Sequence, residues 1–150
     1  MDAERIYVGT SLRANGLEPQ KGEPSFGIID VDTHEVLFSH AFEGAGSVGP
    51  VEYDVQSGRV AMSIGGDLHI FKPEPQEFAE LSEDTPDVQS KMAAPGDGNV
   101  YYGEGNMLYA VNLTSGETQS IAELAKDVTH VAVGTDGTIY VAYSTEVFRV

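Results

Sequence analysis

The sequence contains no cysteine and no tryptophan, and only 8 of its 150 residues are lysine or arginine. Without cysteine the chain can form neither a disulfide nor a thiolate metal site, and it has no cysteine nucleophile. The 24 acidic residues outweigh the 8 basic ones and give a formal net charge of −16. Nucleic acids and anionic membranes bind clusters of lysine and arginine, so we expect neither as a partner.

Long apolar runs are also missing, since no stretch approaches the roughly 18 apolar residues of a membrane-spanning helix. The opening residues, MDAERIYVG, lack the basic and apolar segments of a secretion signal, and no compartment is predicted. Hydrophobic residues nevertheless make up 41% of the chain. That share is enough for a folded core and too high for a disordered acidic tail. The acidity fits either ordinary solubility or adaptation to high salt.

A repeat with a period of about 40 residues organises the chain. Three segments align: SGRVAMSIGGDLHIF at 57–71, DGNVYYGEGNMLYAV at 97–111 and DGTIYVAYSTEVFRV at 136–150. Their glycines, Gly58, Gly98 and Gly137, are 40 and 39 residues apart. A fourth copy opens the chain at 4–12 and resumes at 26–31, which places an insertion between these two parts.

Each copy predicts β-strands. The pairs Ser57-Gly58, Asp97-Gly98 and Asp136-Gly137 predict two-residue hairpin turns, because glycine supplies the positive φ of a primed turn. The flanking segments are short and rich in Val, Ile, Tyr and Phe, which favour strands. Weak helical patterning at 76–83 and 119–126 coincides with the expected fourth strand of a copy, so we predict strands there too. The predicted fold class is all-β.

Four strands in about 40 residues is the length of one β-propeller blade. The repeat resembles the YVTN- and PQQ-like propeller repeats, and three pieces carry the match: DGNVYYG at 97–103, LYAVN at 108–112 and SGE at 115–117. Residues 136–141 and 26–37 match in part. The Trp-Asp pair of WD40 repeats is excluded, because the chain has no tryptophan. The resemblance implies propeller blades of four antiparallel strands and no particular activity.

We expect one propeller segment over residues 1–150. Its blades are expected at 4–44 (partial), 49–82, 90–124 and 128–150 (partial), which gives about 14 strands and an incomplete ring. Propellers have roughly 4–8 blades and close to protect their edges. We therefore expect the ring to be completed by the remainder of a longer propeller or by self-association.

The resemblance also implies where a ligand would bind, namely on the face built from the loops between strands two and three and between blades. These loops are expected at 12–25, 65–67, 103–106, 143–146, 44–49, 84–89 and 126–128. The insertion supplies three candidate ligand-binding residues, Arg13, Asn15 and Lys21. The alternative is a surface loop without a role in binding.

The repeat alignment places Val51, Lys91 and His130 at one equivalent position, near the start of the innermost strand. Lys91 and His130 are therefore candidate ligand-binding residues at the mouth of the channel. A metal site needs three or more convergent ligands, and only an aspartate such as Asp127 lies near His130 in the sequence. We therefore predict no metal, and a structural role for His130 is the alternative.

Other motifs are explained by the repeat. His40 and His69 fall on outer strands, away from the axis, and are expected to be structural. The spacing Asp30-x-Asp32-x-x-Glu35 is similar to the opening of a calcium loop, but it lacks the glycine and the downstream glutamate of such loops. We predict a hairpin turn there instead.

Three functions remain open at this point. The first is a non-catalytic propeller segment whose loops bind another protein or a glycan, because no convergent catalytic residues and no cofactor motif are found. The second is part of a propeller enzyme acting on a polysaccharide, a lyase or hydrolase, whose other residues lie outside this chain. This alternative depends on Lys91, His130 and the insertion sharing one face. A repeat oligomerisation module is a third alternative.

Overall fold

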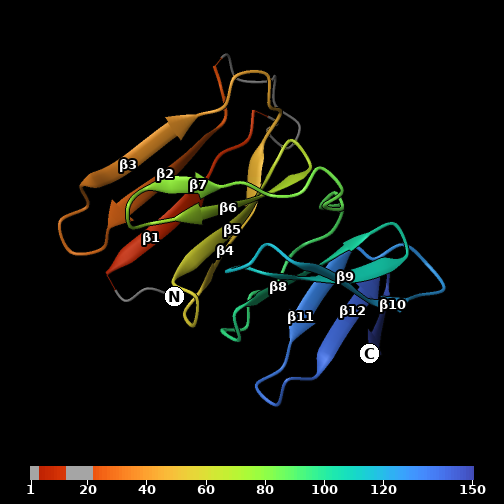
Figure 1. The fold of residues 1–150 in the computed structure, drawn as a ribbon. Coiled ribbons are helices and arrows are strands. Elements are labelled where there is room, and N and C mark those ends of the chain that lie inside the picture. Colours follow the sequence, from red (N-terminus) through yellow and green to blue (C-terminus); the bar gives the residue numbers. More distant parts are fainter. Residues whose placement is uncertain (1–3, 13–21) are drawn as a thin grey trace.

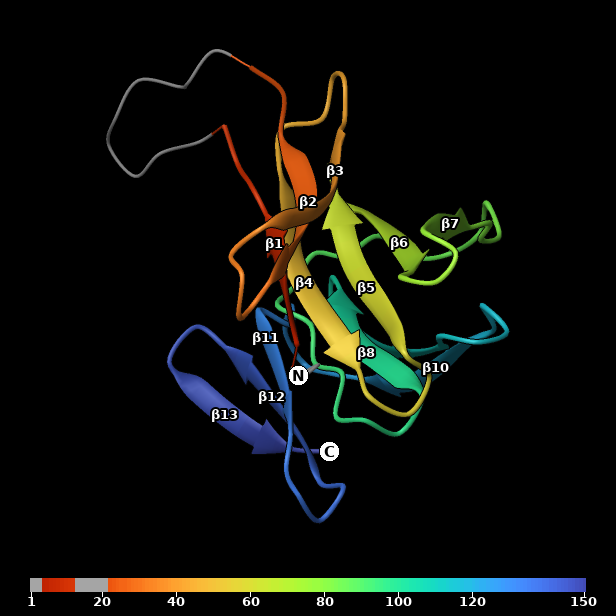
Figure 2. The same ribbon diagram turned by 90° about the vertical axis from the view of Figure 1, so that its left-hand side faces the viewer.

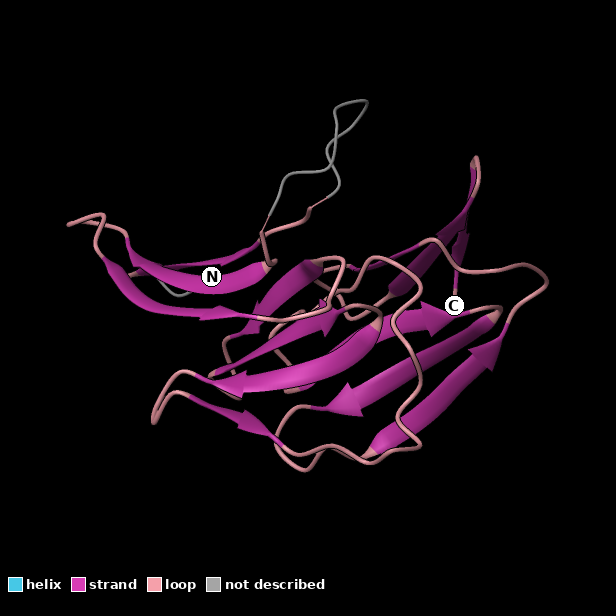
Figure 3. Ribbon diagram, turned by 90° about the horizontal axis from the view of Figure 1, so that it is seen from above, coloured by secondary structure: helices cyan, strands magenta, loops and turns pink. Residues whose placement is uncertain are grey.

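The computed structural model describes residues 4–12 and 22–150. These residues form strands and loops only (Figures 1 and 3), which confirms the all-β prediction, and they include no helix that could cross a membrane. The strands group into four sheets: β1 (Arg5–Gly9), β2 (Ser25–Asp30) and β3 (Val36–Ala41); β4 (Val48–Asp54), β5 (Arg59–Ile64), β6 (Asp67–Lys72) and β7 (Glu77–Ala79); β8 (Asn99–Glu104), β9 (Met107–Asn112) and β10 (Thr118–Glu123); β11 (His130–Val133), β12 (Ile139–Tyr143) and β13 (Glu146–Arg149).

Each sheet is an antiparallel meander in which strands that follow one another in the chain pair with one another. The four sheets also follow one another in chain order. The first sheet (β1–β3) and the fourth sheet (β11–β13) lie at opposite ends of the series, and the sheets do not close into a ring (Figures 1 and 2). This arrangement matches the expected incomplete ring of blades.

The predicted turn glycines adopt the backbone conformation that the sequence indicates. Gly58, Gly98 and Gly137 have φ angles of 67°, 86° and 79°. The predicted two-residue length is wrong, however, because residues 55–58 connect β4 to β5 and residues 134–138 connect β11 to β12.

Aspartate side chains stabilise these longer turns. The Ser57 amide donates a hydrogen bond of 2.7 Å to Asp54 Oδ2, and the Thr138 amide donates one of 3.0 Å to Asp136 Oδ1. In each turn the aspartate carboxylate accepts a backbone amide that has no partner in the strand ladder. This bond stabilises a connection longer than two residues.

The third sheet lacks the innermost strand that was expected near residue 90. There Ala93 forms a single antiparallel bridge with Tyr101, and Lys91 forms a parallel bridge with His130 of the next sheet. The backbone there divides its hydrogen bonds between two sheets: Ala93 bonds to Tyr101 of the third sheet, whereas the Lys91 amide and carbonyl bond to Thr129 O and to the Val131 amide beside the fourth sheet. The described residues therefore form thirteen strands instead of about 14.

The hydrophobic core is divided into three clusters, one between each pair of consecutive sheets. The first joins β2 to β5 and β6, with Phe26, Ile28 and Phe71 fully or almost fully buried. The second joins the second and third sheets, and the third joins the third and fourth. Each inner sheet is therefore covered on both faces, whereas the first and fourth sheets are covered on one.

Candidate functional site

Hydrogen bonds join the loops at one end of the sheets into a continuous surface. We call it the loop face and define it as residues 42–47, 65–66, 84–89, 105–106 and 124–128. Two of its backbone bonds link successive sheets, Val88 N to Gly66 O (2.7 Å) and Val128 N to Gly105 O (2.7 Å), and a third, Gly65 N to Ser47 O (3.0 Å), extends the pairing of β4 with β5. These described loops, which the sequence assigns to one ligand face, are therefore in contact.

A valine repeated every 40 residues anchors the loop face. Val48, Val88 and Val128 are all buried, and each donates its backbone amide to the preceding sheet. Val48 lies close to Gly9, and Val128 lies close to Gly103. Glycine is needed at both positions, because an added Cβ would collide with the valine. The loops therefore rest on a rigid, repeated support.

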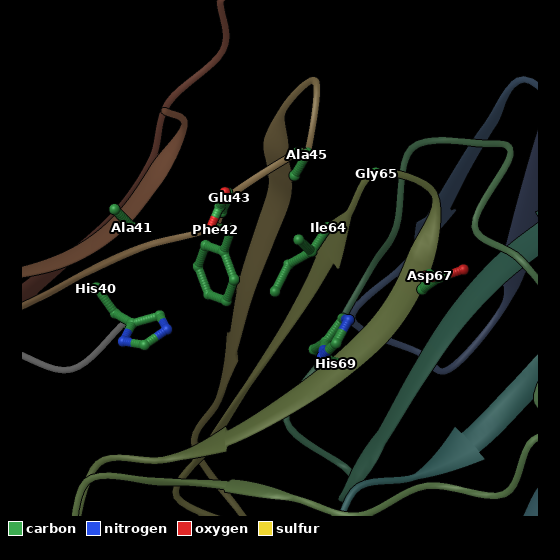
Figure 4. A pocket seen from close by; sticks show the side chains of 10 residues that line it. His40, Ala41, Phe42, Glu43, Ala45, Ile64, Gly65, Asp67 and His69 are labelled. Atoms are coloured by element: carbon green, nitrogen blue, oxygen red, sulfur yellow. The ribbon is translucent and has the colours of Figure 1, made fainter. Parts of the chain in front are cut away.

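The first hollow in this region has a volume of about 440 Å³ and lies between the first and second sheets (Figure 4). Its lining includes His40 from β3, Phe42 and Glu43 from the following loop, and Asp67 and His69 from β6. The His40 and Phe42 rings pack with their centroids 4.8 Å apart. Figure 4 shows the two imidazoles on opposite sides of the Phe42 ring.

The chemistry of the first hollow is mixed apolar and polar. Burial lowers the pKa of His69, while the nearby Asp67 carboxylate partly opposes that shift. A neutral imidazole both donates and accepts a hydrogen bond. The hollow therefore offers aromatic surface together with neutral and acidic hydrogen-bonding groups, and no lysine or arginine from residues 4–12 or 22–150 lines it.

The second hollow, of about 410 Å³, shares Gly65 with the first. Glycines and serines make up most of its wall: Gly46, Ser47, Gly49, Ser63, Gly65, Gly66 and Val88. Because glycine has no side chain, a ligand there would contact backbone groups directly. The two hollows therefore lie on either side of Gly65, at the edge of the loop face.

The structure brings Lys91 and His130 together, as the repeat alignment indicates. The Lys91 amide donates to Thr129 O (3.0 Å) and the Val131 amide donates to Lys91 O (3.3 Å), which forms the parallel bridge between Lys91 and His130. Both side chains are exposed, and His130 Nδ1 lies 3.2 Å from Thr129 Oγ1. Neither residue lines the two hollows.

The other three candidates, Arg13, Asn15 and Lys21, lie outside the described residues. A role for the insertion therefore stays a prediction. Its described end is tied to the loop face, because the Leu12 amide donates to Gly46 O (3.3 Å).

Two residues of the first hollow were expected to be structural only. His40 and His69 do make aromatic contacts, with Phe78 between them at centroid distances of 5.8 and 6.3 Å, but both also line the hollow. The alternation of Phe38, His40 and Phe42 in the sequence could have indicated this position, because alternate residues of a strand share one face. His40 stands directly opposite the buried Phe26 in the ladder, so it faces the second sheet.

Within residues 4–12 and 22–150, no group of three or more His, Cys, Asp or Glu side chains could hold a metal ion. The acidic segment that is similar to a calcium loop is a turn, as predicted. Asp30 Oδ1 accepts hydrogen bonds from the Asp32 and Thr33 amides at 3.0 and 2.7 Å. These bonds, above all those from Thr33, lower the pKa of Asp30.

Comparison with known proteins places the fold. No family model matches the chain, and no curated protein matches its sequence. Among solved structures, a protein of unknown function from Bacteroides caccae has a TM-score of 0.60 at 15% identity, covering 98% of this chain and 54% of that one. A chain of the mitotic checkpoint complex has a TM-score of 0.61 at 18% identity, covering 95% and 48%.

A third structure is similar over the same length. The extracellular domain of a putative one component system from B. thetaiotaomicron has a TM-score of 0.54 at 10% identity, with 99% of this chain and 26% of that one covered. The chain therefore spans about half the length of the first two structures and a quarter of the third. At these identities the likeness concerns the fold alone, which is an all-β, propeller-like series of antiparallel sheets.

Proposed function

We propose that this chain is a non-catalytic segment of YVTN- or PQQ-like propeller repeats that binds a protein or a glycan on its loop face. One observation carries the proposal. The loops between the first and second sheets line two hollows, of about 440 and 410 Å³, which share Gly65 in their walls. Loops held on a rigid scaffold are where binding residues concentrate.

The lining chemistry supports binding more than catalysis. The walls combine aromatic rings, backbone amides of glycine-rich loops and two carboxylates, Glu43 and Asp67. Such a surface can pack against the apolar parts of a ligand and hydrogen-bond its polar groups. The formal charge of −16 favours ligands that are neutral or basic.

A substitution that fills the second hollow tests the proposal. Gly46 lies in its wall, an added Cβ there meets nothing within 4 Å, and its φ lies outside the left-handed region. We expect Gly46→Tyr to fold normally and to abolish binding of ligands selected from an oligosaccharide array and a displayed peptide library. Thr114→Tyr, in an exposed turn at the opposite end of the third sheet, is the control and should bind normally.

The outcome is decisive in either direction. Loss of binding in Gly46→Tyr alone supports the loop face as the binding site. Ligands that bind both variants equally, or the absence of any ligand for the unmodified chain, would contradict it.

The neighbouring positions of Lys91 and His130 favour a second candidate function, as part of a propeller lyase or hydrolase acting on a polysaccharide. A basic residue beside a histidine can assist proton transfer. Incubation with acidic polysaccharides, followed by assays for new reducing ends and for unsaturated products, tests this alternative. Activity lost in both Lys91→Met and His130→Ala would support it.

A further inference from the structure

Exposed apolar side chains gather at the two ends of the series of sheets. Among the described residues, nine large hydrophobic side chains are exposed, and Val55 is the one that lies outside the two terminal sheets and the segments next to their strands. The other eight are Ile6, Val31, Val36, Leu37, Tyr140, Val147, Phe148 and Val150. Concentrated apolar surface of this kind indicates an interaction site.

The repeat shows what these positions do elsewhere in the molecule. We call the face of a sheet that packs on the preceding sheet its leading face, and the opposite face its trailing face. In the first sheet the leading face carries Ile6, Val8 and Ile29. The repeat equivalents in the second and third sheets are completely buried: Val60 and Val100, Met62 and Tyr102, Phe71 and Val111.

Neighbouring residues confirm the orientation of the first sheet. Tyr7 packs in the cluster that joins the first and second sheets, and adjacent strand residues point to opposite faces, so Ile6 points away. Val36 stands directly opposite Ile29 and therefore shares the leading face. Its side chain is 65% exposed.

The fourth sheet has the complementary exposed face. Val141 is buried against the third sheet, so Tyr140 and Ala142 point to the trailing face, and Val147 stands opposite Ala142. Val147 is 68% exposed. Its repeat equivalents, Leu68 and Leu108, are buried by the sheet that follows each of them.

We propose that a second copy of this chain covers both faces, with the leading face of each copy's first sheet on the trailing face of the other's fourth sheet. All three contacts between sheets join a trailing face to a leading face, and within the described residues one face of each kind is left uncovered. A head-to-tail pair continues this contact. It makes a two-fold symmetric ring of eight sheets, which is within the 4–8 blades of propellers.

Charge makes the pairing dependent on salt. Each copy carries a formal charge of −16, so repulsion opposes association at low ionic strength. At about 1 M salt the Debye length falls to roughly 3 Å. The repulsion between copies is then screened, and burial of the apolar faces favours association. We expect the pair to form in high salt and to dissociate on dilution into low salt.

Light scattering coupled to size-exclusion chromatography measures the association. In 1–2 M KCl we expect the unmodified chain to have twice the 16.0 kDa mass of one copy. Val36→Asp and Val147→Asp each place a charge in one of the proposed contacts and should weaken association at least tenfold. Val55→Asp replaces an equally exposed valine, at 65%, away from both faces, and is the matched control.

Mixing the variants tests the head-to-tail geometry. A mixed ring of Val36→Asp and Val147→Asp has one contact with both aspartates and one contact with none. We therefore expect the mixture to recover association at concentrations where each variant alone is a monomer. Circular dichroism of each variant verifies that it is folded.

Three results would overturn the proposal. The first is a 16 kDa monomer at every concentration in high salt, which would assign the faces to a different chain. The second is a pair that neither aspartate weakens. The third is a mixture that stays monomeric, because this excludes the alternation of leading and trailing faces.

Discussion

Asp54 is a fully buried carboxylate that connects two sheets. It ends β4, and its Oδ2 accepts the Ser57 amide at 2.7 Å within its own turn. Its Oδ1 accepts the Gly98 amide at 3.2 Å from the first turn of the next sheet. A buried carboxylate is costly unless it is hydrogen-bonded, and these two amides supply the bonds.

We expect Asp54→Ala to lower the free energy of unfolding by about 1–3 kcal/mol, because it leaves two amides without a buried acceptor. Urea unfolding followed by circular dichroism measures the loss. Asp136→Ala is the matched control, since Asp136 accepts the Thr138 amide on the exposed surface. Equal losses in the two variants would contradict the role of burial.

Gly98, in the turn before β8, has a backbone conformation that disfavours a side chain. Its φ of 86° is strained for a β-branched residue, so Gly98→Val should destabilise the fold by about 1–3 kcal/mol. Gly46→Val, at a position without positive φ, should cost much less. Thermal melts of both variants give the comparison, and equal melting temperatures would refute it.

Glu52 contributes a pH dependence. It lies in a hollow of about 240 Å³ with apolar side chains such as Met92, Val131 and Val133, and burial raises the pKa of its carboxyl. The folded state therefore disfavours the ionised form, and this penalty grows as the pH rises through the pKa.

We accordingly expect Glu52→Gln to raise the melting temperature at pH 7. The difference should disappear below about pH 4, where the carboxyl is protonated in both the folded and unfolded chain. Glu80→Gln, in an exposed loop, controls for the loss of one negative charge. A gain that is the same at pH 4 and pH 7 would show that ionisation is not its cause.

Between the elements, an arginine at the start of a strand reaches the outer turn of the next sheet. Arg59 Nη1, at the start of β5, donates to Leu113 O at 2.6 Å and to Thr114 O at 3.1 Å, in the turn after β9. Its repeat equivalent, Arg5 in β1, forms a 3.1 Å ion pair with Glu74. The two arginines occupy the same position in consecutive repeats.

The two contacts should differ in strength. Arg59→Met keeps the aliphatic stem but removes a charged donor from two carbonyls, so we expect a loss of about 1–2 kcal/mol. Arg5→Met should cost less than about 1 kcal/mol, because Glu74 is largely exposed. Hydrogen exchange at the turn after β9 should rise in Arg59→Met alone. Unchanged hydrogen exchange in this turn would show that the turn does not depend on Arg59.

The elements were largely predictable from the repeat, because a strand can be recognised from its own residues. The glycines at 58, 98 and 137 located the turns, and their positive φ angles agree. The strand β7 lies within the segment 76–83 and β10 overlaps the segment 119–126, where strands were predicted in spite of weak helical patterning. The absence of a strand near Lys91 was not predictable. Lys91 pairs with His130 of another sheet, and the residues around Lys91 do not indicate this long-range pairing.

The candidate site was less predictable than the strands. The repeat alignment correctly indicated that Lys91 and His130 lie side by side, whereas the place of the insertion at 13–21 stays a prediction. The first hollow was not predicted, because His40 and His69 line it from two different sheets, and the packing of these sheets depends on aromatic contacts between them. Spacing within one repeat carries no information on such contacts between sheets.

At the scale of the whole molecule, the fold is a linear array in which each sheet contacts its neighbours. The stability of such an array is approximately the sum of the stabilities of its sheets and of the contacts between neighbouring sheets. The terminal sheets have one neighbour instead of two, so they unfold first. In dilute, low-salt solution we expect amide exchange in β1 and β13 to be faster than in β5 and β9. Mass spectrometry of exchanged peptides measures this gradient, and uniform protection along the chain would argue against it.

The division of the core into clusters between consecutive sheets also shapes how the chain can fold during synthesis. The first cluster draws on residues up to Phe78, the second on residues up to Leu113, and the third on residues up to Val141. Each cluster can therefore close as soon as one more repeat leaves the ribosome, without waiting for the C-terminus. The nascent chain then exposes the trailing face of its latest sheet, which is the surface that a chaperone would meet.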